Sequence, residues 1–119
     1  MARKEKLLEA IGYMRPSSAT NVGPDKDSVA RQRKAIEGYA KSAGMVIVDW
    51  FYDKAVLGAD AITERPGFAA MLDRIASNGV RTIIVESPDR FARDLAVQLA
   101  GHDHLRKLGV TLTPATAPD

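Results

Sequence analysis

The segment GYMRPSS, residues 12–18, places a phenol, a guanidinium and two hydroxyls directly after a short apolar run. A hydroxyl beside a permanent positive charge suits attack on a phosphodiester, because positioning and electrostatic stabilisation supply most of the catalysis of phosphoryl transfer. In extended backbone Arg15 and Ser17 point to the same side, and Ser18 points away. Both serines also suit an ordinary turn before the loop TNVGPDKDS, so this segment by itself leaves catalysis and structure open.

A second cationic group lies in PDRFARD, residues 88–94. Helical periodicity predicts a helix that starts near Asp89 or Arg90, with Asp89 as its N-cap, so that Arg90 and Arg93 share one face. Arginines in a first helical turn oppose the helix dipole, which favours anions there. The pair therefore indicates an anionic partner, and a phosphate bound among Arg15, Arg90 and Arg93 meets that need.

The elements that would position these residues alternate along the chain. Apolar runs at 10–14, 45–52, 81–87 and 110–114 predict strands, and helical periodicity predicts helices at about 28–43, 66–78 and 89–108. This order predicts a three-layer α/β domain with a mostly parallel sheet of four to five strands flanked by helices. The apolar stripes expected to face the core are Val29, Ile36, Tyr39, Ala40 and Ala43, then Phe68, Met71, Leu72 and Ile75, then Phe91, Leu95, Leu99, Leu105 and Leu108.

Ligands of open parallel sheets bind beyond the carboxyl ends of the strands. That rule brings residues 15–18, Asp53 and residues 86–93 to one edge. Gln32 lies on the stripe of the first helix, either as a polar residue at its margin or as a hydrogen-bond donor at the mouth of the sheet. Arg65 is either a surface charge or a cation that reaches over the same edge from the predicted loop at 53–64.

The composition excludes several other chemistries. With no cysteine in 119 residues, disulfides, thiol catalysis and thiolate metal sites are excluded. The chain lacks a glycine-rich phosphate loop, a carboxylate pair for magnesium at a strand end, and a histidine base for Ser17, since His102 and His104 lie far along the third helix. We therefore expect no metal and no cofactor.

Charge and hydropathy restrict the partners and the compartment. A net charge of +2 requires any DNA contact to come from local clustering of cations. No apolar run reaches membrane-spanning length, and we expect a cytoplasmic protein that contacts no membrane.

Three separated motifs resemble the serine recombinases, the resolvase and invertase family. YMRPSS is similar to the Tyr-x-Arg-x-Ser-[Ser/Thr] signature of that family, DRFARD to its Asp-Arg-x-x-Arg-Asp segment, and ERPGFAAML to its Arg-Pro-Gly helix entry. Gln32 falls where the family carries a glutamine on its first helix. The resemblance covers residues 10–113.

The resemblance implies a resolvase-like fold and site-specific recombination of DNA through a 5′-phosphoserine intermediate, without metal or ATP. Ser17, four residues after Tyr13 in the signature, would be the nucleophile. The catalytic set would be Ser17, Arg15, Arg90, Arg93 and Asp89, with Asp89 orienting the guanidiniums. The supporting or phosphate-binding set would be Arg65, Gln32, Tyr13 and Asp53, with Tyr13 a support for the strand end and not the nucleophile.

The resemblance also defines the expected domain organisation. We expect an N-terminal extension at 1–9, a catalytic domain at 10–114 and a linker at 115–119, with the long dimerisation helix and the DNA-reading domain of these recombinases absent. Double-stranded DNA and further copies, as a dimer or tetramer, would be partners of a longer protein. This chain alone is expected to bind DNA weakly and to recombine little or not at all. Leu57 stands where the family usually carries serine, which puts one polar phosphate contact in doubt.

Two other functions stay open at this point. One is a catalytically silent module of the same fold that mediates regulation or assembly, which the replacement at Leu57 favours. The other is an enzyme that handles a small phosphate ester, although the chain shows no glycine-rich turn to bind one.

Overall fold

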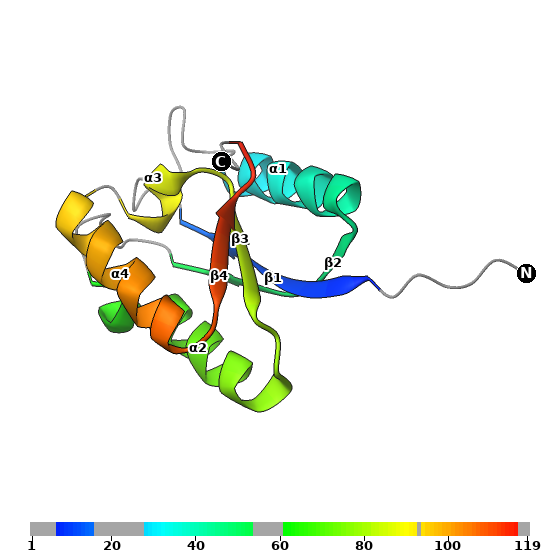
Figure 1. Cartoon of the computed structure of the whole chain (residues 1–119). Helices are drawn as coiled ribbons and strands as arrows, with labels where there is room; N and C mark the ends of the chain where they lie inside the picture. The colour runs from blue at the N-terminus through cyan, green and yellow to red at the C-terminus, as the bar shows by residue number, and fades with distance from the viewer. Residues whose placement is uncertain (1–6, 16–27, 54–60, 93, 117–119) are drawn as a thin grey trace, which may run out of the picture.

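Four parallel strands form the sheet of this computed structural model, in the order β2-β1-β3-β4 (Figure 1). The structure describes residues 7–15, 28–53, 61–92 and 94–116, with the side chains of Ser28 and Asp89 outside that description. The strands are β1 Leu8–Met14, β2 Met45–Tyr52, β3 Thr82–Val85 and β4 Thr111–Pro114. Each overlaps the apolar run that predicts it, and the parallel α/β class is confirmed.

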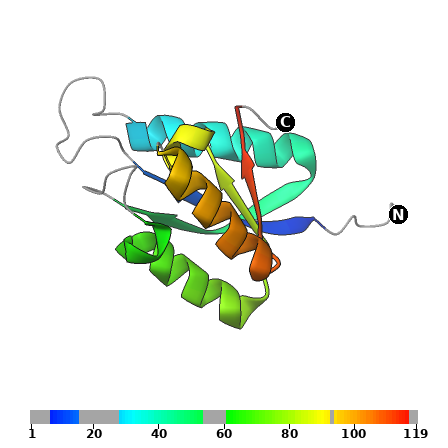
Figure 2. The same cartoon turned by 60° about the vertical axis from the view of Figure 1, so that its left-hand side comes forward.

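Helices cover both faces of this sheet. One face carries α1 (Ser28–Ala43), and the other carries α2 (Pro66–Asn78) and α4 (Leu95–Lys107). A 3-10 turn, η2 (Ile62–Glu64), precedes α2, and a single helical turn, α3 (Pro88–Phe91), follows β3. Figure 2 shows α1 and α2 on opposite sides of the strands. These are the three layers that the alternation of elements predicts.

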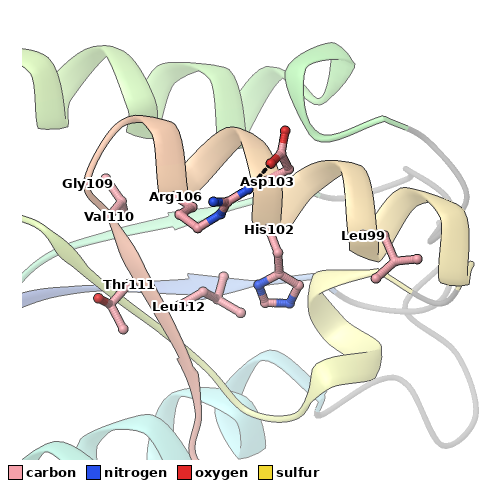
Figure 3. Close-up of a pocket in the computed structure, with 8 residues that line it drawn as sticks. All are labelled: Leu99, His102, Asp103, Arg106, Gly109, Val110, Thr111 and Leu112. Carbon is pink, nitrogen blue, oxygen red and sulfur yellow. Dashed lines mark hydrogen bonds and ion pairs between the residues drawn. The ribbon is translucent and has the colours of Figure 1, made fainter.

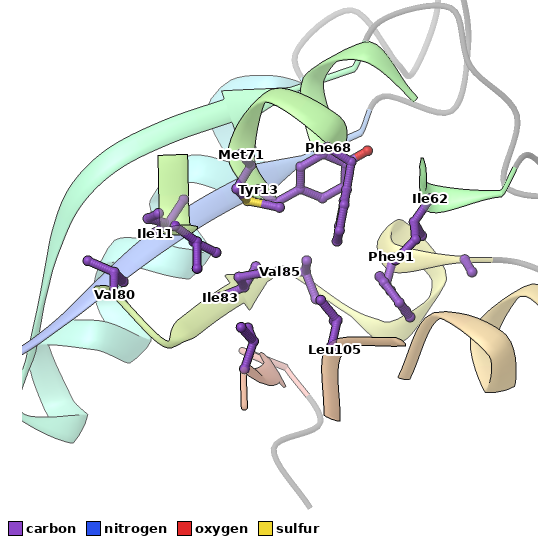
Figure 4. Packing of buried hydrophobic residues seen from close by; sticks show 13 residues of the cluster. Ile11, Tyr13, Ile62, Phe68, Met71, Val80, Ile83, Val85, Phe91 and Leu105 are labelled. Carbon is purple, nitrogen blue, oxygen red and sulfur yellow. The ribbon is translucent and has the colours of Figure 1, made fainter. Parts of the chain in front are cut away.

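Alternation along the strands divides the core into two apolar clusters. β1 turns Ala10 and Met14 toward α1, where they pack with Ile36, Ala40 and Ile84. Its Ile11 and Tyr13 face the larger cluster on the other side, between the sheet and α2, α3 and α4 (Figure 4). The predicted stripe of α2 is confirmed, because Phe68, Met71 and Ile75 are all buried there.

The third predicted helix is in fact two helices. α3 ends at Phe91, Ala92 is extended with φ −160° and ψ 135°, and α4 begins at Leu95. The predicted N-cap role of Asp89 is wrong, because Ser87 is the N-cap residue of α3 and the Asp94 carboxylate caps α4 by accepting from the Ala96 and Val97 amides. The predicted continuous helix from Asp89 to Leu108 is therefore wrong, and Arg93 lies outside the described residues.

The break also changes which residues of α4 face the core. Leu95 and Leu99 are 67% and 64% exposed, so the predicted apolar stripe is wrong at both positions, as it is at the exposed Leu108. Gly101 and Leu105 are buried instead. A Cβ on Gly101 would lie 2.6 Å from the Phe91 ring, so the absence of a side chain lets α4 pack against α3. On α1, Ala43 is likewise exposed and not part of the core.

The hydrogen bonding of the first and last strands extends slightly beyond the apolar runs that predict them. β1 begins at Leu8, so Leu8 and Glu9 also belong to the sheet. The amides of Ala115 and Thr116 donate to the carbonyls of Val85 and Glu86, at 2.7 and 2.9 Å. The hydrogen bonding between β4 and β3 therefore continues past the end of β4. Within the described ranges no helix is both long and apolar enough to cross a membrane.

Candidate active site

The backbone of Arg15, at the end of β1, is held from two neighbouring elements. Its amide donates to Gln32 Oε1 at 3.0 Å, and its carbonyl accepts from Gln32 Nε2 at 3.4 Å and from Arg90 Nη1 at 3.1 Å. Gln32 is fully buried on α1, and a buried amide is tolerated there because both of its ends are hydrogen-bonded. Gln32 is thus not a polar residue at the margin of the stripe. It fixes the strand end that leads into the segment with Ser17.

Two buried guanidiniums hold the last turn of α3. Arg15 is 1% exposed and donates from Nε to the Arg90 carbonyl at 3.0 Å. Arg65, at the N-cap of α2, is fully buried and donates from Nη1 to the Phe91 carbonyl. In a continuous helix these carbonyls would accept from residues 94 and 95. The two guanidiniums donate to these carbonyls instead, so the carbonyls keep hydrogen-bond partners at the point where α3 ends.

A second polar cluster lies beside Arg65. Tyr13 donates its hydroxyl to Asp53 Oδ2 at 2.8 Å and accepts from Arg65 Nη1 at 3.5 Å. The Asp53 carboxylate also accepts from the amides of Gly67 and Phe68, so the residue after β2 caps α2. A Cβ on Gly67 would lie 2.3 Å from the Tyr52 carbonyl oxygen, so only glycine permits this approach.

The ionisation state of Tyr13 follows from this cluster. Burial, and then the negative charge of Asp53, raise the pKa of the Tyr13 phenol well above its ordinary value. The phenol therefore stays protonated and acts as a donor to Asp53. This supports the interpretation of Tyr13 as a support and not a nucleophile.

Replacing Tyr13 with Phe tests this cluster. The change leaves a buried carboxylate with one donor fewer, so we expect the free energy of unfolding to fall by about 1–3 kcal/mol near neutral pH. Urea denaturation of Tyr13→Phe and Tyr52→Phe measures it, since Tyr52 is half exposed on the edge strand β2. Equal stability of the two variants would contradict a role for the hydroxyl in holding Asp53.

The same variant has a pH signature. Above a pH of about 10 an unfolded chain releases the tyrosine proton, whereas the folded state with its raised Tyr13 pKa retains it. The stability of the wild type therefore falls as pH rises above that value, and it does not change below it on account of Tyr13. We expect Tyr13→Phe to lose part of this alkaline decrease, and Tyr52→Phe to keep it.

Glu86 forms ion pairs with two arginines at the same edge of the sheet. Glu86, directly after β3, accepts from Arg90 Nε at 3.3 Å through one carboxylate oxygen and from Arg31 Nε at 3.0 Å through the other. The Arg90 side chain is 11% exposed and that of Arg31, on α1, is 50% exposed. Neither Glu86 nor Arg31 is among the site residues predicted from the sequence. The spacing of four residues between Glu86 and Arg90 is the one signal that could have identified the first.

The structure thus brings Arg15, Gln32 and Arg90 together at the carboxyl edge of the sheet, as the sequence predicts. Tyr13, Asp53 and Arg65 form the neighbouring cluster, and their described hydrogen bonds go to each other and to backbone groups. The predicted nucleophile Ser17, the cation Arg93 and the side chain of Asp89 lie outside the described residues, as does Leu57. Among the described residues no group of three or more histidines or carboxylates could hold a metal ion.

A large open groove lies elsewhere, between α4 and β4 (Figure 3). Its volume is about 670 Å³, and its lining includes His102, Arg106 and Leu112. Arg106 is paired with Asp103 on its own helix, and the His102 ring packs 4.9 Å from that of Phe91. These contacts explain both side chains structurally, and none of the predicted site residues that the structure describes lines the groove.

A family model described as "Resolvase, N terminal domain" matches residues 10–118. No curated protein matches the sequence. The catalytic domain of TP901-1 integrase is similar in fold, with a TM-score of 0.78 and 22% identity over 92% of this chain and 79% of that one.

Two further structures share the fold. A resolvase family site-specific recombinase from Streptococcus pneumoniae has a TM-score of 0.75 at 22% identity, covering 94% of this chain and 74% of that one. The catalytic domain of ISC1926 TnpA, an IS607-like serine recombinase, has a TM-score of 0.74 at 22% identity, covering 91% of this chain and 70% of that one.

Proposed function

Because this chain belongs to the family of resolvase N-terminal domains, we propose that Ser17 is the nucleophile with which it cleaves and rejoins DNA. The family is that of the serine recombinases, so the chain is a recombinase catalytic domain. In the proposed reaction Ser17 Oγ attacks a backbone phosphorus atom, and the bond from phosphorus to the 3′ oxygen breaks. The 3′ oxygen takes up a proton and leaves as a hydroxyl, while the 5′ phosphate stays on Ser17. The reverse attack by a 3′ hydroxyl rejoins the strand.

The observation that carries this proposal is the reciprocal contact between Arg15 and Arg90. Arg15 Nε donates to the Arg90 carbonyl at 3.0 Å, and Arg90 Nη1 donates to the Arg15 carbonyl at 3.1 Å. The contact joins segments 75 residues apart at one edge of the sheet, two residues before Ser17. A low-dielectric surrounding strengthens the attraction between a buried guanidinium and a phosphate, which supports Arg15 and Arg90 as phosphate-binding residues. Arg93 joins them on the family resemblance.

The remaining predicted residues have two kinds of role in this proposal. Gln32, Arg65, Tyr13 and Asp53 are positioning residues, because their described hydrogen bonds hold the end of β1, the end of α3 and the start of α2. Asp89 orients a neighbouring guanidinium, as the family resemblance implies. Double-stranded DNA and further copies of the chain are the proposed partners.

A covalent adduct tests the proposal. The full-length protein is incubated with a duplex that carries its site and a nick beside the scissile phosphate. The short cut strand then dissociates, so that cleavage cannot be reversed. We expect a protein–DNA adduct in the wild type and in Ser18→Ala, and none in Ser17→Ala. Peptide mapping should place the DNA on Ser17. DNA binding without an adduct in the wild type would favour the catalytically silent module, and an adduct lost only in Ser18→Ala would reassign the nucleophile.

A further inference from the structure

Glu86 joins two arginines from different layers of the fold. Its two carboxylate oxygens accept from Arg90 on α3 and from Arg31 on α1, which lie 4 and 55 residues away in the sequence. One carboxylate thus holds the two guanidiniums next to each other. Arg90 is largely buried, whereas half of the Arg31 side chain faces solvent. The edge of the sheet thus presents a second cation, more accessible than the first.

The charges of this group do not cancel. Two guanidiniums share one carboxylate, so the group keeps a net charge of +1. Arg31 lies at the end of the first turn of α1, where a positive charge opposes the helix dipole, and that turn itself contains no acidic residue. A half-exposed ion pair contributes only about 0–1 kcal/mol to folding. Stability alone is a weak reason for placing Arg31 here, and an external anion is a stronger one.

We propose that Arg31 is a further DNA-backbone contact, which Glu86 holds beside Arg90 so that it binds a phosphate next to the one that is cleaved. The inference rests on the proposed function, since that function places DNA at this edge. Each DNA strand carries one phosphate for about every 3.4 Å of helix axis, so a strand held by Arg90 presents neighbouring phosphates to nearby cations. Arg31 would fix the register of the strand without reading its sequence.

The same helix supplies a matched control. Arg33 is two residues further along α1, and its side chain is 53% exposed, close to the 50% of Arg31. Two residues correspond to about 200° around a helix, so Arg33 points away from the edge. Its guanidinium stacks 4.6 Å from the Trp50 ring centroid and pairs with Glu37. Arg31→Gln and Arg33→Gln thus remove the same charge from the same helix at two different faces.

The test is the salt dependence of DNA binding. The affinity of the protein for two duplexes of unrelated sequence is measured by fluorescence anisotropy over a series of salt concentrations. We expect Arg31→Gln to reduce the slope of log K against log salt by about 0.9, as for one lost phosphate contact, and equally on both duplexes. Arg33→Gln should keep the wild-type slope. An unchanged slope in Arg31→Gln, an equal loss in Arg33→Gln, or no salt-dependent binding by the wild type would each overturn the inference.

Two further measurements separate this inference from its alternatives. Urea denaturation shows whether Arg31→Gln acts through folding, and we expect its unfolding midpoint to match that of Arg33→Gln, because both changes remove one half-exposed ion pair. The Ser17 adduct reports on the proposed function independently. An adduct in the wild type with an unchanged slope in Arg31→Gln would remove only the role of Arg31. A reduced slope without any adduct would retain the DNA contact and remove the catalytic function.

Discussion

Replacing Arg65 with Met is expected to lower the free energy of unfolding by about 3–5 kcal/mol, because it removes one member of a buried, hydrogen-bonded ionic cluster. Arg65 is fully buried, and its guanidinium bonds the Phe91 carbonyl and the Tyr13 hydroxyl. Methionine fills much of the volume but donates no hydrogen bond. The Phe91 carbonyl then loses its donor from Arg65. The Asp53 carboxylate, which is bonded to Tyr13, loses the positive charge of Arg65 on the other side of that phenol.

Chemical denaturation of Arg65→Met and Arg74→Met measures the effect. Arg74 is 58% exposed and pairs with Asp49 at 3.4 Å, so its loss should cost no more than about 1 kcal/mol. Natural domains are stable by about 5–15 kcal/mol, so Arg65→Met can unfold entirely. In that case Arg65→Lys, which keeps the charge but not the fork of donors, should fold with intermediate stability. Equal stabilities of Arg65→Met and Arg74→Met would show that the buried cluster does not hold α3.

Replacing Arg90 with Lys is expected to lower the rate of DNA cleavage by about 10²–10³-fold, the cost typical of removing one donor that stabilises transition-state charge. Within the described part of the chain, Arg90 uses Nε for Glu86 and Nη1 for the Arg15 carbonyl, so the contacts described there involve neither Nη2 nor the second hydrogen on Nη1, and these are the donors we expect a phosphate to accept from. A lysine ammonium carries the same charge but cannot bond a carboxylate, a carbonyl and a phosphate in this planar arrangement.

Single-turnover formation of the Ser17 adduct measures this rate. Arg81→Lys is the matched control, because Arg81 is exposed, lies before β3 at the opposite edge of the sheet, and donates only to nearby carbonyls in the described part of the chain. We expect Arg81→Lys to cleave at the wild-type rate. A rate in Arg90→Lys that matches this control, in a protein of wild-type stability, would exclude Arg90 from the phosphate site.

Residues at the ends of helices, and the spacing of apolar residues within them, predicted α1 and α2 from the sequence. Pro66, which stands at the first position of α2, and the spacing of Phe68, Met71 and Ile75 predicted α2 with its buried face. Gly44 and Gly79 follow α1 and α2 with a φ of 77°, a conformation that glycine adopts at little cost. Such signals act within one turn of backbone, so they are readable without knowledge of the fold.

Signals from distant residues were not readable in this way. Helical periodicity continues across Ala92, but the helix ends at Phe91, where Arg15 and Arg65 bond the carbonyls that a continuous helix would use. The periodicity also assigned Leu95 and Leu99 to the core, and the break exposes both. Gln32 was ambiguous on its own helix because its partner, the backbone of Arg15, is 17 residues away.

The sequence by itself determined the class of fold, the family and the edge of the sheet at which the candidate residues meet, because strand order and motif order are properties of the chain. Only the tertiary structure decided which polar side chains are buried, where the third helix breaks, and that Glu86 holds Arg31 beside Arg90. These outcomes depend on hydrogen bonds between residues 17 to 75 positions apart. Such bonds form only after the layers have packed, since desolvated charges and carbonyls must then find partners within reach.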